Sequence, residues 1–550
     1  MEKKEIFRYL VVCFTLLLLL VPDICVGWEI TNYYFPLDDS PRNQYYPWVT
    51  YNPIDNEFMG AWRTSGRLKD TCDPGDEYDC THSFHTIDGR RASPDGDLLG
   101  DIIQLSPPAE GWKMVPRGAH NVFTNEYLVV FTVGTEGHTN EDIPNARMDM
   151  VIMDSAGNIK HGPRHLLDYG GGAMLPVVVF NPTEREYLVV YNDSEIFSEH
   201  KNNIGFIVDE QGTTVKGPFL IGSAQALLGD QYAPLAAYNP TNNTYYIVWE
   251  DFRNSSNWME PCDIYGGLFD ADGNMIVETT IFDDHGTEDA GDQRVPNVAY
   301  NPDKNEFLAV WVDPAPPATN KGIRGVLIDA DGALAGSVFM VEDHHRIQHW
   351  PSLAYIEEER KYFISWTDTR NDGLPADDPW YYTENMDIYG RWLDDTGNPV
   401  GEEIELCVEE GNQSSGFVSY NPLMKSILVA WYDRNAPDDY TTDPEEGDLW
   451  AEEPGNVMAT LYGNPSFLTA RVVEKGTGNP VEGALALVIG PSLPVLERTN
   501  AWGWCNIVEN SHPAGTYLVI ASKLGYLVSF QLVNYTGEPI QATVEMNKLW

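Results

Sequence analysis

Short apolar segments separated by polar turns recur along most of the chain. One copy begins at Pro296 and ends at Asp313, with two apolar segments on either side of an Asn-Pro turn. Close copies begin at Pro47, Pro176, Pro234 and Pro351, and weaker copies begin near Pro116 and Gly416. A period of roughly 60 residues indicates a repeat architecture. Function is therefore expected where the copies differ from one another.

Each full copy predicts four short antiparallel strands. In the copy that begins at Pro296, segments 297–300, 306–311 and 323–328 predict the first three strands. The turn that ends at Gly332 leads to a fourth strand near 337–341, because glycine readily adopts the positive φ of a tight hairpin. Four antiparallel strands per repeat are typical of one blade of a β-propeller. The sequence therefore predicts an all-β fold, with a seven-bladed β-propeller over residues 28–463.

The last copy is incomplete in sequence. Its third strand is predicted at 457–462, and the chain then enters a region with a different pattern. Segment 28–35 is strand-like and precedes the first copy. We expect segment 28–35 to supply the missing strand of the last blade and so to close the ring.

Three blade elements recur with similar spacing. They are Val248-Trp249-Glu250-Asp251, Asp263-Ile264-Tyr265-Gly266 and the hairpin Asp270 to Gly273, with counterparts at Ser365 to Asp368 and at Asp387 to Gly390. The pattern resembles secreted bacterial and archaeal repeat propellers over residues 28–463. The resemblance implies an architecture and leaves the activity open, because propellers host many functions.

The pattern changes at Thr469, where alternating strands are separated by Gly and Pro turns. These features predict a small β-sandwich over residues 464–550. The order of its motifs, at 470–488, 499–504 and 513–526, resembles the carboxypeptidase regulatory-like, transthyretin-like domain. The resemblance implies a non-catalytic attachment that serves adhesion, spacing or stabilisation.

Residues 1–27 predict a secretory signal peptide, because a basic start at Lys3, Lys4 and Arg8 precedes the apolar run 9–21. An uncleaved anchor is the alternative. We expect a secreted or cell-surface protein with no stable membrane insertion once the signal is removed. Cys72 and Cys80 lie close together, which favours a disulfide in an oxidising compartment.

The chain carries 34 basic and 83 acidic residues, a formal charge of −49. This charge argues against nucleic acid and anionic membranes as partners, because both bind basic patches. A solvated acidic surface is the favoured explanation. Calcium, which carboxylates bind outside cells, is the one cofactor that the composition suggests.

Strand direction sorts the loops onto two faces. The short hairpin turns share one face, and the long second-to-third loops share the other with the crossovers between blades. Binding residues commonly occupy variable loops on a rigid scaffold. The first candidates are carboxylates at the ends of the second strands: Asp193, Asp251, Asp313, Asp368 and Asp433. They either cap their loops and pair with arginine, which we favour, or together bind a cation or polar ligand.

Two further groups lie on the same face. Aromatic residues that could stack on sugar rings, or simply pack the loops, are Trp258, Trp380, Tyr381, Tyr382, Tyr440 and Trp450. His344, His345 and His349 form a cluster with the composition of a transition-metal site, although a plain surface cluster is favoured.

The leading hypothesis is a non-enzymatic protein that binds a polysaccharide, a glycoprotein or a cell-envelope protein through the long-loop face. The competing hypothesis is a calcium-assisted extracellular hydrolase, such as a carbohydrate-active enzyme, that uses paired carboxylates on that face. A purely structural envelope component is the third. The sequence contains no nucleophile elbow, phosphate-binding loop or dinucleotide fingerprint.

Overall fold

The computed structural model describes residues 29–549 with gaps. The gaps are 39–42, 68–82, 108–112, 135–145, 167–173, 194–199, 256–260, 284–292, 314–321, 344–347, 372–384, 410, 435–454, 464–465, 492–493, 509–512 and 537–539. Over these residues no helix combines the length and apolar character needed to cross a bilayer. The chain divides into two compact units, one of Ile30–Tyr462 and one that contains Gly463–Trp550.

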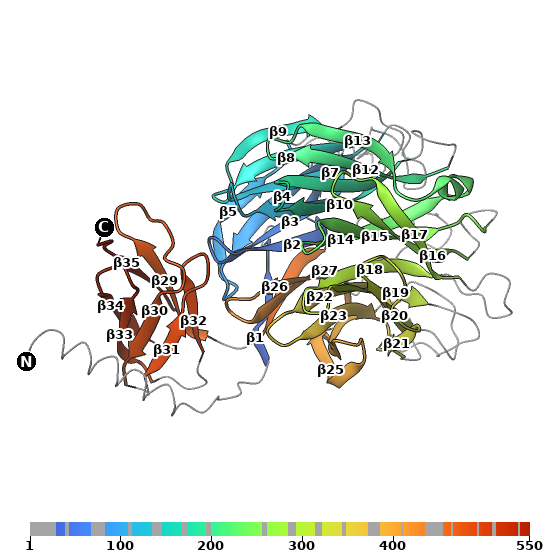
Figure 1. The fold of residues 1–550 in the computed structure, drawn as a ribbon. Helices are drawn as coiled ribbons and strands as arrows, with labels where there is room; N and C mark the ends of the chain where they lie inside the picture. The colour runs from blue at the N-terminus through green and yellow to red at the C-terminus, as the bar shows by residue number, and fades with distance from the viewer. Residues whose placement is uncertain are drawn as a thin grey trace, which may run out of the picture. The chain divides into compact units, whose positions relative to one another are not determined.

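The larger unit contains seven four-stranded sheets in its described residues (Figure 1). The first holds β2 (Asn43–Asn52), β3 (Glu57–Arg67), β4 (Ser83–Ala92) and β5 (Leu98–Gln104), and the second β6 (Lys113–Asn121), β7 (Glu126–Val133), β8 (Arg147–Asp154) and β9 (Ile159–His165). The third holds β10 (Met174–Asn181), β11 (Glu186–Asp193), β12 (Asn202–Asp209) and β13 (Thr214–Leu220), which a short 3-10 helix η1 (Ala224–Leu228) follows.

The other four sheets repeat this order. The fourth holds β14 (Gln231–Asn239), β15 (Thr244–Asp251), β16 (Asp263–Asp270) and β17 (Met275–Phe282), and the fifth β18 (Arg294–Asn301), β19 (Glu306–Asp313), β20 (Gly322–Asp329) and β21 (Phe339–Glu342). The sixth holds β22 (Gln348–Ile356), β23 (Lys361–Asp368), β24 (Asp387–Asp394) and β25 (Pro399–Cys407). The last holds β26 (Asn412–Asn421), β27 (Ser426–Arg434), β28 (Asn456–Gly463) and β1 (Glu29–Pro36).

The first six sheets are antiparallel throughout, with the strands paired in chain order. Their first strands contact one another in sequence from β2 to β26, and β26 also contacts β2. This cyclic arrangement of four-stranded antiparallel sheets is that of a β-propeller. The all-β fold class predicted from the sequence is confirmed.

The last sheet is assembled from both ends of the larger unit. Its strand order is β1-β28-β27-β26, so β1 forms the outer strand beside β28. Directly after β1, the Leu37 N–H donates to the Val457 carbonyl oxygen at 2.9 Å. The Trp62 indole N–H donates to an Asp38 carboxylate oxygen at 3.2 Å, which links this segment to the first sheet as well.

The Asn-Pro turns connect neighbouring sheets. In each turn the last residue adopts a positive φ, for example 54° at Asn56 and 53° at Asn305. In four of the Asn-Pro turns the side-chain amide of the asparagine donates to this residue in the next sheet, as Asn239 does to Asn305 at 2.8 Å. Asn421 makes the same bond to Asn56 at 3.1 Å, across 365 positions. The repeated turn therefore also joins the last sheet to the first.

The core of the larger unit lies between adjacent sheets. Five tryptophans at equivalent positions in second strands are fully buried: Trp62, Trp249, Trp311, Trp366 and Trp431. Each belongs to the end of a strand in which nearly every residue is buried, because both faces of the strand are covered. These second strands also contact the innermost strand of the next sheet, so their packing helps to position the residues that line the centre.

The smaller unit is a β-sandwich of two sheets. One has the order β32-β29-β35 and the other β31-β30-β33-β34. Their strands are β29 (Ser466–Glu474), β30 (Leu485–Ile489), β31 (Val495–Arg498), β32 (Trp504–Val508), β33 (Gly515–Ser522), β34 (Ser529–Tyr535) and β35 (Ile540–Met546). β29 runs parallel to β35 and antiparallel to β32. Residues such as Leu468, Val519 and Val544 form its own core.

Candidate functional site

Every innermost strand of the larger unit has a β-bulge near its start. The strand pairing is irregular at the same place in each copy, for example between Tyr232 and Leu235 and between His349 and Ser352. In six of the seven strands, all but β26, the repeat proline lies inside the bulge and the residue before it adopts a positive φ. These residues are Tyr46 (55°), Val115 (48°), Leu175 (50°), Ala233 (44°), Val295 (51°) and Trp350 (50°). Such angles cost a non-glycine residue about 1–3 kcal/mol.

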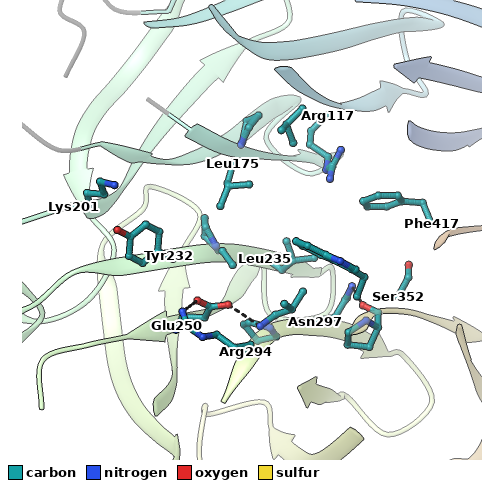
Figure 2. Close-up of a pocket in the computed structure, with 18 of the residues that line it drawn as sticks. Arg117, Leu175, Lys201, Tyr232, Leu235, Glu250, Arg294, Asn297, Ser352 and Phe417 are labelled. Carbon is teal, nitrogen blue, oxygen red and sulfur yellow. Dashed lines mark hydrogen bonds and ion pairs between the residues drawn. The ribbon is translucent and has the colours of Figure 1, made fainter. Parts of the chain in front are cut away.

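The bulges surround a cavity of about 670 Å³ (Figure 2). Its wall includes residues from β6, β10, β14, β18, β22 and β26, together with Lys201, Asp230, Glu250 and Phe252. Cavities that hold small ligands commonly measure roughly 300–1,000 Å³. Because β-bulges re-aim side chains, the repeated bulge is the local feature that brings the residue before five of the prolines to this space, Tyr46 in β2 being the exception.

The cavity lies at the end of the propeller that carries the long loops. Asp251, the last residue of β15, pairs with Gln231 at the start of β14 and with Asp263 at the start of β16. The bulge of β14 is therefore beside the loop that joins β15 to β16. The sequence placed candidate binding residues on this same face.

The cavity wall is largely apolar and aromatic. Phe417, Tyr232, Phe252 and Trp350 line it, and Trp350 leaves 45% of its surface exposed. The positive φ of Trp350 belongs to the repeated bulge, so the feature particular to Trp350 is a large aromatic ring that the packing of the strands leaves exposed. These properties fit a surface that stacks on a ligand.

Two carboxylates line the cavity, and both are held by the protein. Glu250 accepts hydrogen bonds from the Arg294 guanidinium at 3.1 Å and from the Val295 backbone N–H at 2.7 Å, so it fixes the bulge of β18 (Figure 2). Asp230 accepts from the Lys201 backbone N–H at 3.0 Å and lies 3.3 Å from the His200 ring nitrogen. Both carboxylates therefore position neighbouring chain segments.

Besides Arg294, two further cations line the cavity, Arg117 and Lys201. The Arg117 guanidinium carbon lies 4.2 Å from the centroid of the Phe417 ring, and the Lys201 ammonium lies 5.2 Å from that of Tyr232. Burial lowers the pKa of Arg117 to about 9, so the side chain is still charged at neutral pH. Figure 2 shows Arg117 and Phe417 extending from separate strands into the same space.

The five aspartates at the ends of the second strands, predicted as a possible cation or ligand site, are buried. None of them belongs to the described lining of the cavity. Asp251 and Asp368 each accept a hydrogen bond from the tryptophan two positions before, at 2.8 and 3.0 Å. Each also pairs with the arginine two positions after, at 2.6 Å in both cases. Asp313 pairs with Arg324 in the next strand. Asp433 accepts a weak hydrogen bond from Gln413 at 3.4 Å, and Asp193 is 1% exposed.

The burial of Asp433 predicts that its substitution changes the stability of the fold in a pH-dependent way. Burial raises its pKa from 3.8 to about 6, against the hydrogen bond from Gln413 and assisted by the charge of Glu409. A raised carboxyl pKa stabilises the fold fully below pH 3.8, and this contribution is lost as the pH rises through 6. We expect Asp433→Asn to raise the free energy of unfolding by about 1–3 kcal/mol at pH 8 and to have little effect near pH 4.

Urea unfolding at the two pH values, followed by tryptophan fluorescence, measures this difference. Asp331→Asn, in an exposed turn, is the matched control and should change neither value. The prediction is contradicted if Asp433→Asn is less stable than the unmodified protein at pH 8 in buffer with calcium but not in buffer without it. That result would show that Asp433 is a calcium ligand.

Most of the other predicted site residues lie outside the described residues. They are Trp258, Trp380, Tyr381, Tyr382, Tyr440, Trp450, His344, His345, Cys72 and Cys80. His349 is in β22, where burial lowers its pKa to about 4 although Asp368 opposes the shift. Within the described ranges no three His, Cys, Asp or Glu side chains are grouped as a metal site would require. Cys262, Cys407 and Cys505 are buried and form no disulfide among the described residues.

The sequence patterns used above do not predict the residues that line the cavity, although the repeat contains a feature that indicates them. The repeat proline is nearly constant, but the residue before it varies among Tyr, Val, Leu, Ala and Trp. Attention to variation inside the repeat, as well as in the long loops, would have selected these positions.

Comparisons with known proteins concern the fold alone. No family model matches the chain, and no curated protein matches its sequence. It is similar in structure to a protein of unknown function from Dyadobacter fermentans, with 12% identity, a TM-score of 0.43 and coverage of 80% of this chain and 99% of that one. The phage phi92 endosialidase has 10% identity, a TM-score of 0.43 and coverage of 79% and 69%. The Dos1 propeller has 9% identity, a TM-score of 0.42 and coverage of 79% and 95%. Similarities at this level carry no argument about activity.

Proposed function

We propose that the chain is a secreted or cell-surface protein that binds a carbohydrate, without catalysis, in the central cavity of a seven-bladed propeller. The carbohydrate belongs to a polysaccharide or to a glycoprotein. A glycosylated protein of the cell envelope is one such partner. The terminal sandwich, a carboxypeptidase regulatory-like domain in this proposal, assists attachment. Amino-terminal sequencing of the secreted protein tests the signal: a mature start near residue 28 supports it, and a start at Met1 contradicts it.

The observation that carries this proposal is the exposed indole of Trp350 in a cavity of about 670 Å³. Flat aromatic rings stack on the apolar faces of sugars, and the polar groups at the cavity wall can bind hydroxyls. The bulge of β22 supports a binding role, because β-bulges re-aim side chains and this one turns the Trp350 ring toward the cavity.

Trp350→Ala is expected to reduce affinity for the bound glycan at least about tenfold, as loss of a central aromatic anchor usually does. Trp350→Phe should retain part of the affinity because a ring remains. A glycan array identifies the ligand, and isothermal titration with that glycan measures the affinity of each variant.

Phe123→Ala is the matched control, because Phe123 is 52% exposed and lies outside the cavity lining. Its affinity should equal that of the unmodified protein. The proposal is wrong if the unmodified protein binds no glycan, or if Trp350→Ala binds the identified glycan with unchanged affinity.

The competing proposal is an extracellular hydrolase, and it rests on Asp230 and Glu250 in the same cavity. Catalysis by two carboxylates needs one of them free to donate a proton and the other free to activate water or attack. The contacts of Glu250 with Arg294 and Val295 argue against that freedom. Release of reducing sugars from the bound glycan, abolished in Glu250→Gln, would establish the hydrolase instead.

A further inference from the structure

Arg117 is an unusual residue for its position in the cavity. It follows Pro116 in the bulge of β6, and one of its terminal nitrogens donates to the Pro116 carbonyl oxygen at 2.7 Å. Among the described residues no carboxylate lies within ion-pair distance of it, and its other N–H groups have no protein acceptor. Its guanidinium rests against the Phe417 ring from a strand at the other end of the repeat series.

Six other described arginines at this end of the propeller are neutralised by carboxylates. Those that pair with carboxylates are Arg147 with Asp149, Arg253 with Asp251 and Glu278, Arg294 with Glu250, Arg324 with Asp313, Arg370 with Asp368 and Glu403, and Arg391 with Glu342 and Glu403. In a chain with 83 acidic and 34 basic residues, partners are abundant. The absence of a carboxylate partner among the described residues therefore sets the partly buried Arg117 apart from these six arginines.

Lys201 is a second cation at the same cavity. Its ammonium group lies over the Tyr232 ring, and no carboxylate of the described structure forms an ion pair with it. The nearby Asp230 is hydrogen-bonded to the Lys201 backbone rather than to its side chain. The cavity therefore presents two cations that the described protein leaves without a counter-ion.

We propose that the ligand of this cavity carries a carboxylate group, as an acidic sugar does, and that Arg117 binds this carboxylate. This inference rests on the proposed carbohydrate-binding function. The planar guanidinium matches a carboxylate with two parallel N–H···O bonds. Lys201 contributes a second positive charge, and the aromatic wall contacts the sugar rings.

The acidic character of the whole chain makes this local chemistry decisive. A net charge of −49 repels polyanions at long range, so an anionic ligand must be held by contacts at short range. A neutral sugar would leave the Arg117 charge partly buried without a partner, which is unfavourable. A sulfate ester shares the negative charge but not the planar geometry, so it serves as a discriminating probe.

The test uses the full mature chain and matched pairs of oligosaccharides. The probes are trigalacturonic acid, oligoglucuronate, oligomannuronate and sialyllactose, each compared with its methyl ester, which has the same shape but no charge. A sulfated trisaccharide is the additional anion. We expect at least one acid to bind about 10- to 100-fold more tightly than its ester, as charge-assisted hydrogen bonds provide.

Arg117→Gln should abolish the preference for the acid over the ester, and Arg117→Lys should retain only part of it. Lys160→Gln is the matched control, because Lys160 is exposed, pairs with Asp154 at 3.1 Å and lies at the opposite, short-turn end. It removes the same charge and should leave the preference intact. Arg117→Gln should also unfold at a higher temperature than the unmodified protein without ligand, because it removes an uncompensated cation. That second measurement shows that the variant is folded.

The outcomes separate the two proposals. Equal binding of acids and esters overturns the role of Arg117 while carbohydrate binding stands. Tighter binding of the sulfated sugar than of every acid also overturns it, because the recognised group would then be a sulfate. If no acid binds but a neutral glycan does, the carboxylate inference is wrong and the proposed function remains. If no glycan of any kind binds, both are wrong.

Discussion

Replacing Leu37 by alanine is expected to lower the free energy of unfolding of the larger unit by about 2–5 kcal/mol, the usual cost of truncating a buried leucine. Leu37 is 1% exposed and packs with residues of the first and last sheets, among them Phe58, Trp62 and Val457. Its contribution is therefore to ring closure as well as to local packing. Urea unfolding followed by tryptophan fluorescence measures the change.

Deleting β1 and Leu37 together should have a larger effect, because β28 would lose its neighbour and become an exposed sheet edge. We expect the deleted protein to lose its cooperative transition, and a synthetic peptide of residues 29–38 to restore it in part. Leu228→Ala is the matched control, since Leu228 is 67% exposed in η1. Unchanged stability in Leu37→Ala, together with a folded deletion variant, would show that the ring does not need this segment.

The strands and turns could be predicted because their signals are local. Apolar runs bounded by Asn-Pro and Asp-Gly turns fixed the ends of β19 and β20 to within two residues of the observed ones. The Asp251 and Arg253 pair could be anticipated for the same reason, because the two residues are only two positions apart. Asp313 differs, since its arginine partner lies across a long loop in β20.

The cavity could not be predicted in this way because its geometry contradicts a local rule. A residue before proline normally prefers an extended conformation, which would not suggest a positive φ at Val295 or Trp350. Tertiary packing of the innermost strands decides this angle. The contact between Arg117 and Phe417 likewise joins segments 300 positions apart, and only ring closure brings them together. Local sequence therefore predicted the scaffold better than the site.

Replacing Asp251 by alanine should destabilise the larger unit by about 3–5 kcal/mol, the typical cost of removing one partner of a buried ion pair. Asp251 is fully buried and accepts hydrogen bonds from the Trp249 indole N–H at 2.8 Å and from the Arg253 backbone N–H at 2.9 Å. It also pairs with the Arg253 side chain at 2.6 Å. Its loss would leave the indole donor buried without an acceptor, although Arg253 would keep Glu278 at 3.0 Å.

The double variant Asp251→Ala with Arg253→Met separates structure from cation binding. Removing both charges should recover part of the lost stability, because no buried guanidinium then remains that has lost one of its two carboxylate partners. Denaturant midpoints of the unmodified protein and the variants, each with and without millimolar calcium, measure this directly. If Asp251 were a calcium ligand, calcium would stabilise the unmodified protein and the double variant would recover nothing. Recovery that is independent of calcium would instead show that the carboxylate caps its loop and neutralises Arg253.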